Sequence, residues 1–275
     1  MQWRGERPRL GQNFLVSATA QAAIVEALGD VSARTVVEIG PGGGAITSLL
    51  ASRARRLVAV ELDRELAARL REQFAGRGSV EVLEQDVLET DFAEIRRQNA
   101  GGERDEAEKL LVVGNLPYYI TSDILLRLFQ SADDVERAVV MVQREVADRI
   151  AADPGSRDYG LLTVTAQMHA RVEKLMTLPP GAFSPPPQVH STVVRFTMAP
   201  RFAELGVEAD PFLRFVRSCF AQKRKMLGKN LRNAGYEAGR VAAAMTKCGV
   251  SASARAEELA VETLAGLWQE LGERA

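Results

Sequence analysis

The stretch "TVVEIGPGGGAITSLL", residues 35–50, predicts a strand, a glycine-rich turn and a helix in direct succession. The run TVVEI is mostly β-branched and apolar, which favours a buried strand, whereas AITSLL has the apolar spacing of a helix. Between them, Gly40, Gly42 and Gly44 permit backbone conformations that side chains disfavour, and a close approach to a ligand. Ligands bind at turns of this kind in parallel α/β sheets. The stretch therefore predicts an α/β fold with a ligand site at the turn.

The same alternation of strand and helix continues along the chain. Buried strands are predicted at residues 56–62, 80–86, 110–115 and 136–143, and helices at 18–29, 63–76, 122–130 and 144–153. This alternation implies a parallel sheet with right-handed crossovers, and we expect 171–178 and 191–198 to pair antiparallel at its edge. From about Asp210 the pattern is helical throughout. We therefore expect a sheet domain over residues 1–205 and a small all-helical domain over residues 206–275.

Composition excludes several classes of protein. The chain has 275 residues, 2 cysteines and 2 histidines, with neither a disulfide framework nor the Cys/His spacing of a metal site. No apolar run approaches the roughly 20 residues that a membrane helix needs. We therefore expect a cytoplasmic protein without a metal and without a membrane partner.

Carboxylates end two of the predicted strands. Glu61 lies 21 residues after Gly40, a spacing that suits hydrogen bonds from ribose hydroxyls, and Asp86 is placed to bond an adenine amino group. One alternative is that the glycines serve only tight packing and that both carboxylates are exposed strand-end acids. Another is a nicotinamide dinucleotide site, because Gly40, Gly42 and Ala45 satisfy the pattern G-x-G-x-x-A. The glycine turn by itself does not separate these cofactors.

The predicted strand 110–115 ends in "NLPYY", which offers two kinds of group for a nucleobase. The Asn115 side-chain oxygen and a main-chain carbonyl of Leu116 or Pro117 can accept both N–H bonds of an exocyclic amine, and Tyr118 can stack on the ring. Such acceptors localise the nitrogen lone pair and stabilise the positive charge that develops when it attacks an electrophilic methyl group. The motif therefore predicts methylation of an adenine amine.

This chemistry needs no strong base, so the lack of histidine in the motif is consistent with it. The alternative is a turn that buries both tyrosines in the core. We favour that alternative for Tyr119 and Ile120 and the amine-binding role for Asn115, Pro117 and Tyr118.

Positive charge is concentrated in one segment although the net charge is −1. Residues 211–240 contain eight lysines and arginines against one acid, Glu237. A solvated helix face is the alternative, but the imbalance favours a surface that contacts nucleic-acid phosphates. The residues that we assign to RNA binding are Arg217, Lys223, Arg224, Lys225, Lys229 and Arg232.

In combination, these motifs resemble the ribosomal RNA adenine N6,N6-dimethyltransferases of the KsgA/RsmA type. The matching runs are "GQNFL", "EIGPGGG", "VELD", "QDVL", "GNLPYYIT", "FSPPPQVHS" and "FAQKRKMLGKNL", in this order over nearly the whole chain. The resemblance implies a Rossmann-like class I methyltransferase sheet that binds S-adenosylmethionine, followed by a small all-helical C-terminal domain.

The resemblance also implies roles for individual residues. The cofactor would lie against Asn13, Leu15, Gly40, Gly42, Glu61, Asp86 and Asn115. The flipped adenine would be sandwiched between Tyr118 and Phe183. By itself, Phe183 could equally be a loop anchor that packs into the edge of the core, although the prolines after it would stiffen the loop for stacking.

The implied reaction is dimethylation of two adjacent adenosines in the 3′-terminal hairpin of 16S ribosomal RNA, within the assembling small subunit, by a monomer. The alternatives are a large-subunit (23S) enzyme of the macrolide-resistance type and an assembly factor that acts mainly by binding.

Two motifs depart from the family pattern. Tyr119 replaces the second asparagine of "NLPYN", and Gln188 and His190 replace the lysine and aspartate of "PKVDS". We expect His190 to be a surface or packing residue rather than a base.

Overall fold

The computed structural model describes residues 13–98 and 108–273. It divides into two compact units, of which the first comprises Met1–Ala147 with Glu173–Met198 and the second comprises Asp148–Val172 with Ala199–Ala275. The units therefore differ from the single boundary at 205/206 expected from the sequence. Residues 148–172 belong to the second unit because Tyr159, Val164 and Met168 are buried in its hydrophobic core.

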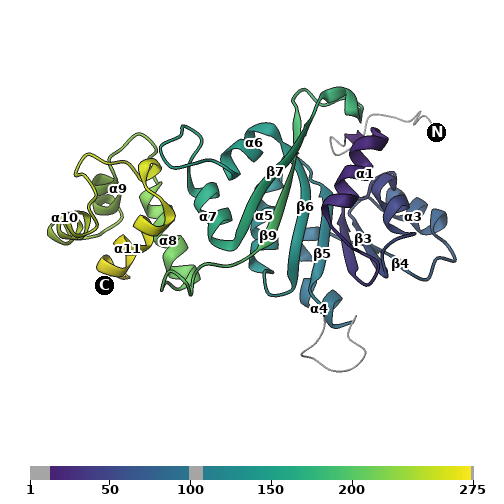
Figure 1. Ribbon diagram of the computed structural model, residues 1–275, viewed down its shortest axis with the longest axis horizontal. Coiled ribbons are helices and arrows are strands. Elements are labelled where there is room, and N and C mark those ends of the chain that lie inside the picture. Colours follow the sequence, from purple (N-terminus) through teal and green to yellow (C-terminus); the bar gives the residue numbers. More distant parts are fainter. Residues whose placement is uncertain (1–12, 99–107, 274–275) are drawn as a thin grey trace. The chain divides into compact units, whose positions relative to one another are not determined.

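A seven-stranded sheet with the order β4-β3-β2-β5-β6-β9-β7 forms the first unit (Figure 1). The strands are β2 Thr35–Ile39, β3 Arg56–Glu61, β4 Val80–Glu84, β5 Leu110–Asn115, β6 Val135–Gln143, β7 Ala170–Leu178 and β9 Ser191–Met198. The first five strands of this order are parallel, and β9 is antiparallel to β6. The side-chain bonds Glu173–Arg195 and Thr177–Thr192 run in opposite directions along β7 and β9, so the predicted antiparallel edge pair is confirmed.

The helices around this sheet follow the predicted alternation, except that the helix at 92–97 was not predicted. They are α1 Ala18–Ala27, α2 Ala45–Leu50, α3 Arg64–Gln73, α4 Phe92–Arg97, α5 Thr121–Gln130 and α6 Arg144–Ile150. Ser17 caps α1 by accepting from the Ala20 N–H, and Asp63 caps α3 by accepting from the Glu65 and Leu66 N–H groups.

A small second sheet was not predicted. It pairs β1 (Phe14–Leu15) antiparallel with β8 (Phe183–Ser184). Each strand has only two residues, too few for any periodicity. The pairing places the Asn13–Leu15 segment beside Phe183.

The strand order reverses between β2 and β5, so the ends of these two strands open the crevice where parallel sheets bind ligands. The two backbones approach closely there. A Cβ atom on Gly114 would lie 2.7 Å from the Ile39 carbonyl oxygen. Because Gly114 has no side chain, the end of β5 can approach β2 closely, and Asn115 lies beside the glycine turn.

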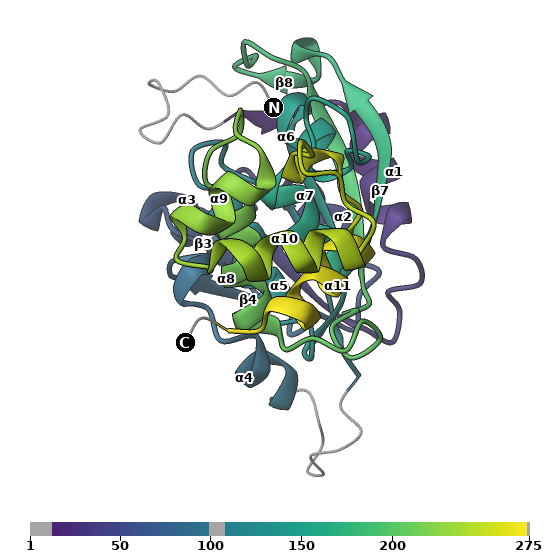
Figure 2. The same ribbon diagram turned by 90° about the vertical axis from the view of Figure 1, so that its left-hand side faces the viewer.

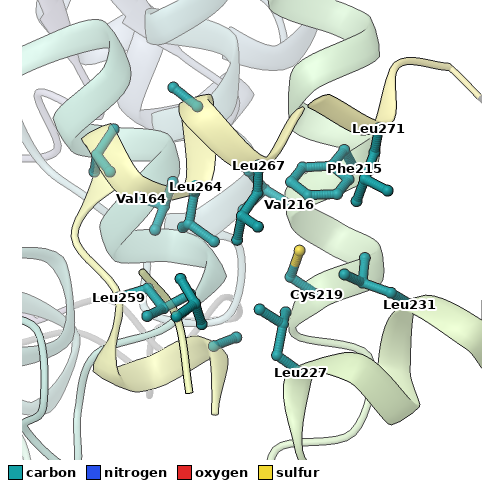
Figure 3. Packing of buried hydrophobic residues seen from close by; sticks show 14 of the residues in the cluster. Val164, Phe215, Val216, Cys219, Leu227, Leu231, Leu259, Leu264, Leu267 and Leu271 are labelled. Carbon is teal, nitrogen blue, oxygen red and sulfur yellow. The ribbon is translucent and has the colours of Figure 1, made fainter. Parts of the chain in front are cut away.

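The second unit contains a group of helices (Figure 2): α7 Leu161–His169, α8 Ala209–Cys219, α9 Leu227–Asn233, α10 Ala238–Lys247 and α11 Val261–Leu271. Figure 3 shows Val164, Phe215, Cys219 and Leu264 pointing into a shared hydrophobic core. The predicted class, an α/β sheet with a small helical C-terminal domain, is confirmed.

No helix within the described ranges is long and apolar enough to cross a membrane. Nor do the described residues contain a group of three or more His, Cys, Asp or Glu side chains that could hold a metal ion. Cys219 and Cys248 are both free thiols.

Candidate active site

The glycine turn after β2 has the conformation that its sequence predicts. Gly40, Gly42 and Gly44 have φ angles of 63°, 55° and 77°, in the left-handed region that favours glycine. A Cβ atom on Gly42 would lie 2.8 Å from the Phe14 ring, and one on Gly40 would lie 3.8 Å from the Asn115 carbonyl oxygen. The turn is therefore held between Phe14 and the end of β5, and Phe14 is a neighbour of the site that sequence reasoning missed.

Glu61 ends β3 as a buried carboxylate, with 3% of its surface exposed. Its Oε2 accepts from the Gly42 N–H and its Oε1 from the Asp63 N–H, each at 3.0 Å. Burial raises the pKa of Glu61, against the effect of these two donors. The Leu62 N–H also acts on this carboxylate. A carboxylate has about four acceptor positions, so one remains for a ribose hydroxyl. The alternative of an exposed strand-end acid is wrong for Glu61.

Asp86 follows β4 and caps the short 3-10 helix Val87–Glu89. Its Oδ1 accepts from the Leu88 N–H at 2.9 Å, which leaves Oδ2 to accept from an amine. Leu62 follows Glu61 directly and exposes half of its apolar surface, although it had no role in the sequence prediction.

The side chain of Asn115 has a defined orientation. Its Nδ2 donates to the Asn13 carbonyl at 2.7 Å, so its Oδ1 is available as an acceptor. Of the two candidate main-chain acceptors, the Pro117 carbonyl already accepts from the Thr121 hydroxyl at 3.0 Å and from the Ile120 N–H at 3.3 Å. Among the described residues, no hydrogen bond reaches the Leu116 carbonyl. The geometry therefore favours Asn115 Oδ1 and the Leu116 carbonyl as the pair of acceptors.

The two predicted stacking rings differ in accessibility. Tyr118 is half-buried, and its hydroxyl shares a 2.6 Å hydrogen bond with the Ser191 hydroxyl. Burial raises the pKa of Tyr118, and this bond offsets part of the effect. Phe183 is 3% exposed and packs in a hydrophobic cluster with Leu15 and Ala182, as a loop anchor would. Its stacking role, and the contact of Leu15 with the cofactor, stay predictions.

Tyr119 does not lie in the core, and that expectation is wrong. Its side chain is 63% exposed, while Ile120 is half-buried. Leu116 is the buried apolar residue before the turn that contains Tyr119, and the buried Thr121 begins α5 after it. Tyr119, between these two buried residues, therefore faces solvent. His190 is exposed, as expected for a surface residue.

Glu38, in the middle of β2, is a buried acid that sequence reasoning did not single out. It is 2% exposed, and burial raises its pKa from 4.5 to about 7, with Thr47 offsetting part of the effect. The one signal was a charged residue within the otherwise apolar run TVVEI.

We expect Glu38→Gln to change how stability depends on pH. Between pH 4.5 and about 7 the folded wild type keeps a proton that the unfolded chain releases, so its free energy of unfolding falls as the pH rises. Over this pH range the free energy of unfolding of the wild type falls by about 3 kcal/mol in total. The glutamine variant has no carboxyl group at this position, so this decrease is absent. Denaturant unfolding of both proteins at pH 4 and pH 8 measures the difference, with the exposed Glu72→Gln as the control. Equal pH dependence in the wild type and Glu38→Gln would contradict the prediction.

The six residues assigned to RNA binding lie on one segment of the second unit, from α8 to α9, and all are exposed. No ion pair joins any of them to an acid in the described part of the chain. The other two cations of the segment are engaged, since Arg214 pairs with Glu273 at 2.7 Å and Arg240 donates to the Leu271 carbonyl at 2.7 Å. We call Arg217, Lys223, Arg224, Lys225, Lys229 and Arg232 the basic surface.

A buried amide holds the turn that carries part of the basic surface. Asn230 is 2% exposed, and its Nδ2 donates to the Cys219 carbonyl at 2.7 Å and to the Gln222 carbonyl at 3.2 Å. These bonds fix the backbone just before Lys223–Lys225, so the three charges are presented from an ordered turn.

The sheet order, the glycine turn after β2 and the amine acceptors after β5 define a class I methyltransferase. A family model described as ribosomal RNA adenine dimethylase matches residues 4–272. The chain belongs to this family. The nicotinamide alternative, which the glycine turn left open, is therefore rejected.

Curated relatives extend the likeness over nearly the whole chain. Ribosomal RNA small subunit methyltransferase A of Acidobacterium capsulatum is 65% identical over 98% of this chain and 92% of its own length. The protein of the same name from Koribacter versatilis is 53% identical over 97% of this chain and 94% of its own length.

Solved structures agree with the fold. The 23S rRNA methyltransferase ErmE is 28% identical, with a TM-score of 0.69 over 95% of this chain and 100% of its own. A dimethyladenosine transferase from Plasmodium falciparum has a TM-score of 0.77 over 94% of this chain and 98% of its own. At 21% identity, the second likeness concerns the fold alone.

Proposed function

We infer that this chain dimethylates N6 of two adjacent adenosines in the 3′-terminal hairpin of 16S ribosomal RNA, with S-adenosylmethionine as the methyl donor. Membership of the ribosomal RNA adenine dimethylase family and relatives named small subunit methyltransferase A support the reaction and the subunit. The single observation that carries the site assignment is the bond from Asn115 Nδ2 to Asn13, which leaves Oδ1 as an acceptor beside the Leu116 carbonyl.

These two oxygens can accept both N–H bonds of the target amine. They orient the nitrogen lone pair and stabilise the positive charge that develops on N6. The product nitrogen is acidic enough to release its proton to water, so the site needs no strong base. Tyr118, held at its hydroxyl by Ser191, supplies the ring face on which we place the adenine.

The residues around the glycine turn fit S-adenosylmethionine, which supplies an electrophilic methyl group when bound. Glu61 keeps an acceptor position for a ribose hydroxyl, and Asp86 keeps one oxygen for the adenine amine. The left-handed Gly40 lies against the end of β5, where a side chain would narrow the space for the amino-acid end of the cofactor.

The test is transfer of labelled methyl from S-adenosylmethionine to ribosomal particles that lack the modification. Small and large subunits are assayed separately, and the nucleosides are digested and identified. Dimethyladenosine from small subunits only is the expected result. Label only in large subunits would instead assign the chain to the 23S type, which the 28% identity with ErmE keeps as the second candidate.

No label in either subunit, with cofactor still bound, would contradict the enzymatic proposal. It would favour an assembly factor that acts by binding. An Asn115→Ala variant that still supports subunit assembly without methylation would show that both roles exist in one chain.

The basic surface is the proposed phosphate-contacting face of the enzyme. We expect Lys223→Ala, Arg224→Ala and Lys225→Ala, combined, to weaken binding to small-subunit RNA and to lower the slope of log affinity against log salt by about 2. Cofactor affinity should not change. The measurement is RNA binding over a salt series, with Arg53→Ala, Arg69→Ala and Arg77→Ala as a control of equal charge on exposed residues of the first unit. An unchanged slope in the first triple variant would exclude this surface as the RNA face.

A further inference from the structure

Several exposed apolar residues adjoin residues of the candidate active site in sequence. Within the described ranges, six large hydrophobic residues are exposed: Val16, Leu62, Tyr119, Leu126, Val189 and Met226. Four of them adjoin site segments. Val16 follows β1, Leu62 follows Glu61, Tyr119 follows Tyr118, and Val189 lies two residues before Ser191, the partner of Tyr118. Single exposed apolar residues need no explanation, so an inference from any of these needs further observations.

Tyr119 is the most exposed of the six, at 63%. In the described part of the chain, neither its hydroxyl nor its ring takes part in a hydrogen bond or a ring contact. Its ring therefore contributes little to the fold. A large aromatic face that the fold does not use, directly after the ring assigned to the target adenine, is available to a ligand.

A cation that follows the neighbouring strand favours a nucleic acid over an apolar partner. Arg144 follows β6, the strand next to β5, and its side chain is exposed without an ion pair to any described acid. Its N–H donates to the His190 carbonyl at 2.9 Å, next to Val189. Tyr119 and Arg144 thus follow the ends of two paired strands, β5 and β6, at the same edge of the sheet. An exposed aromatic face and an exposed guanidinium at one edge fit one nucleotide, with its base on the ring and its phosphate on the cation.

We propose that Tyr119 is a stacking platform for the base next to the target adenosine in the RNA, outside the methylation pocket. The inference rests on the proposed function, because it needs an RNA whose target base is held at Asn115 and Tyr118. When one adenosine of an adjacent pair enters the pocket, its neighbour loses a stacking partner in the RNA. The Tyr119 ring replaces that partner and holds the neighbour at the mouth of the site.

Substitutions of Tyr119 separate the ring from its hydroxyl. We expect Tyr119→Ala to raise KM for unmodified small subunits by roughly 5- to 150-fold, the usual loss of one stacked base, with kcat within about twofold. Tyr119→Phe keeps the ring and should keep KM within about twofold. Because the side chain is exposed, thermal unfolding and cofactor affinity should match the wild type in both variants. Leu126→Ala, an exposed apolar residue of α5, is the matched control.

A direct readout uses a hairpin RNA with 2-aminopurine in place of the adenosine next to the target. Stacking on Tyr119 is expected to change the fluorescence of this base on binding to the wild type and Tyr119→Phe, and Tyr119→Ala should abolish the change. An unchanged KM for Tyr119→Ala, or an equal loss in Tyr119→Phe, would overturn the proposal. A wild type that methylates no small-subunit adenosine would instead refute the proposed function, so the two failures are distinguishable.

Discussion

The Asn115→Ala variant is expected to lose methyl transfer by about 10²- to 10³-fold, the usual cost of removing one group that stabilises transition-state charge. Two interactions disappear together. The target amine loses the Oδ1 acceptor, and the Asn13 carbonyl loses the 2.7 Å bond from Nδ2 that holds Asn13 at the end of β5. The measurement is the initial rate of label transfer to small subunits at saturating cofactor, with cofactor affinity determined separately by calorimetry.

An Asn115→Asp variant separates the two interactions. A carboxylate keeps an acceptor for the amine but cannot donate to the Asn13 carbonyl, so we expect a rate between those of the wild type and the alanine variant. Gln130→Ala, at the exposed end of α5, is the control for a lost amide. If Asn115→Ala retained more than a tenth of the wild-type rate, Asn115 would not be the amine acceptor.

The Glu61→Ala variant is expected to lose cofactor affinity by about a hundredfold. Hydrogen bonds to a charged group contribute about 1.5–3 kcal/mol each, and removing the carboxylate takes away the acceptor proposed for the ribose. It also releases the Gly42 and Asp63 N–H groups, which Glu61 holds at 3.0 Å, so the glycine turn loses support. Isothermal titration with S-adenosylmethionine measures the change.

The exposed Glu65→Gln on α3 is the matched control and should bind cofactor like the wild type. RNA affinity should be unaffected in Glu61→Ala, because the basic surface is on other elements. A cofactor Kd within threefold of the wild type would exclude Glu61 as a ribose ligand.

Much of the fold was predictable because its signals are local. The β-branched runs before Gly40 and Asn115, and the helix caps Ser17 and Asp63, are patterns within a few residues. The unit boundary was not predictable in this way. Residues 148–172 join the helical unit through the burial of Tyr159 and Val164 in its core, which depends on helices that begin after residue 208.

The residues of the candidate site likewise fall into those that local sequence predicted and those that only folding brings together. Glu61 and Asp86 follow from their places at strand ends, and both lie where parallel strands bring them to one edge of the sheet. The roles of Phe14 and Ser191 did not follow. Phe14 faces the glycine turn, and Ser191 bonds Tyr118 across 73 positions of sequence. Neither contact could be predicted from the spacing of residues in the sequence or from its composition.

By itself, the sequence predicted the kind of chemistry: a glycine turn for a nucleoside cofactor, and an amide beside a tyrosine for an amine on a base. Only the tertiary structure decided which way that amide points and which neighbouring carbonyl is already hydrogen-bonded. It also decided that Tyr119 faces solvent while Phe183 is buried. The physical reason is that residue type sets what a group can donate or accept. Its direction and exposure depend on partners such as the Asn13 carbonyl, which folding brings to Asn115 across 102 positions of sequence.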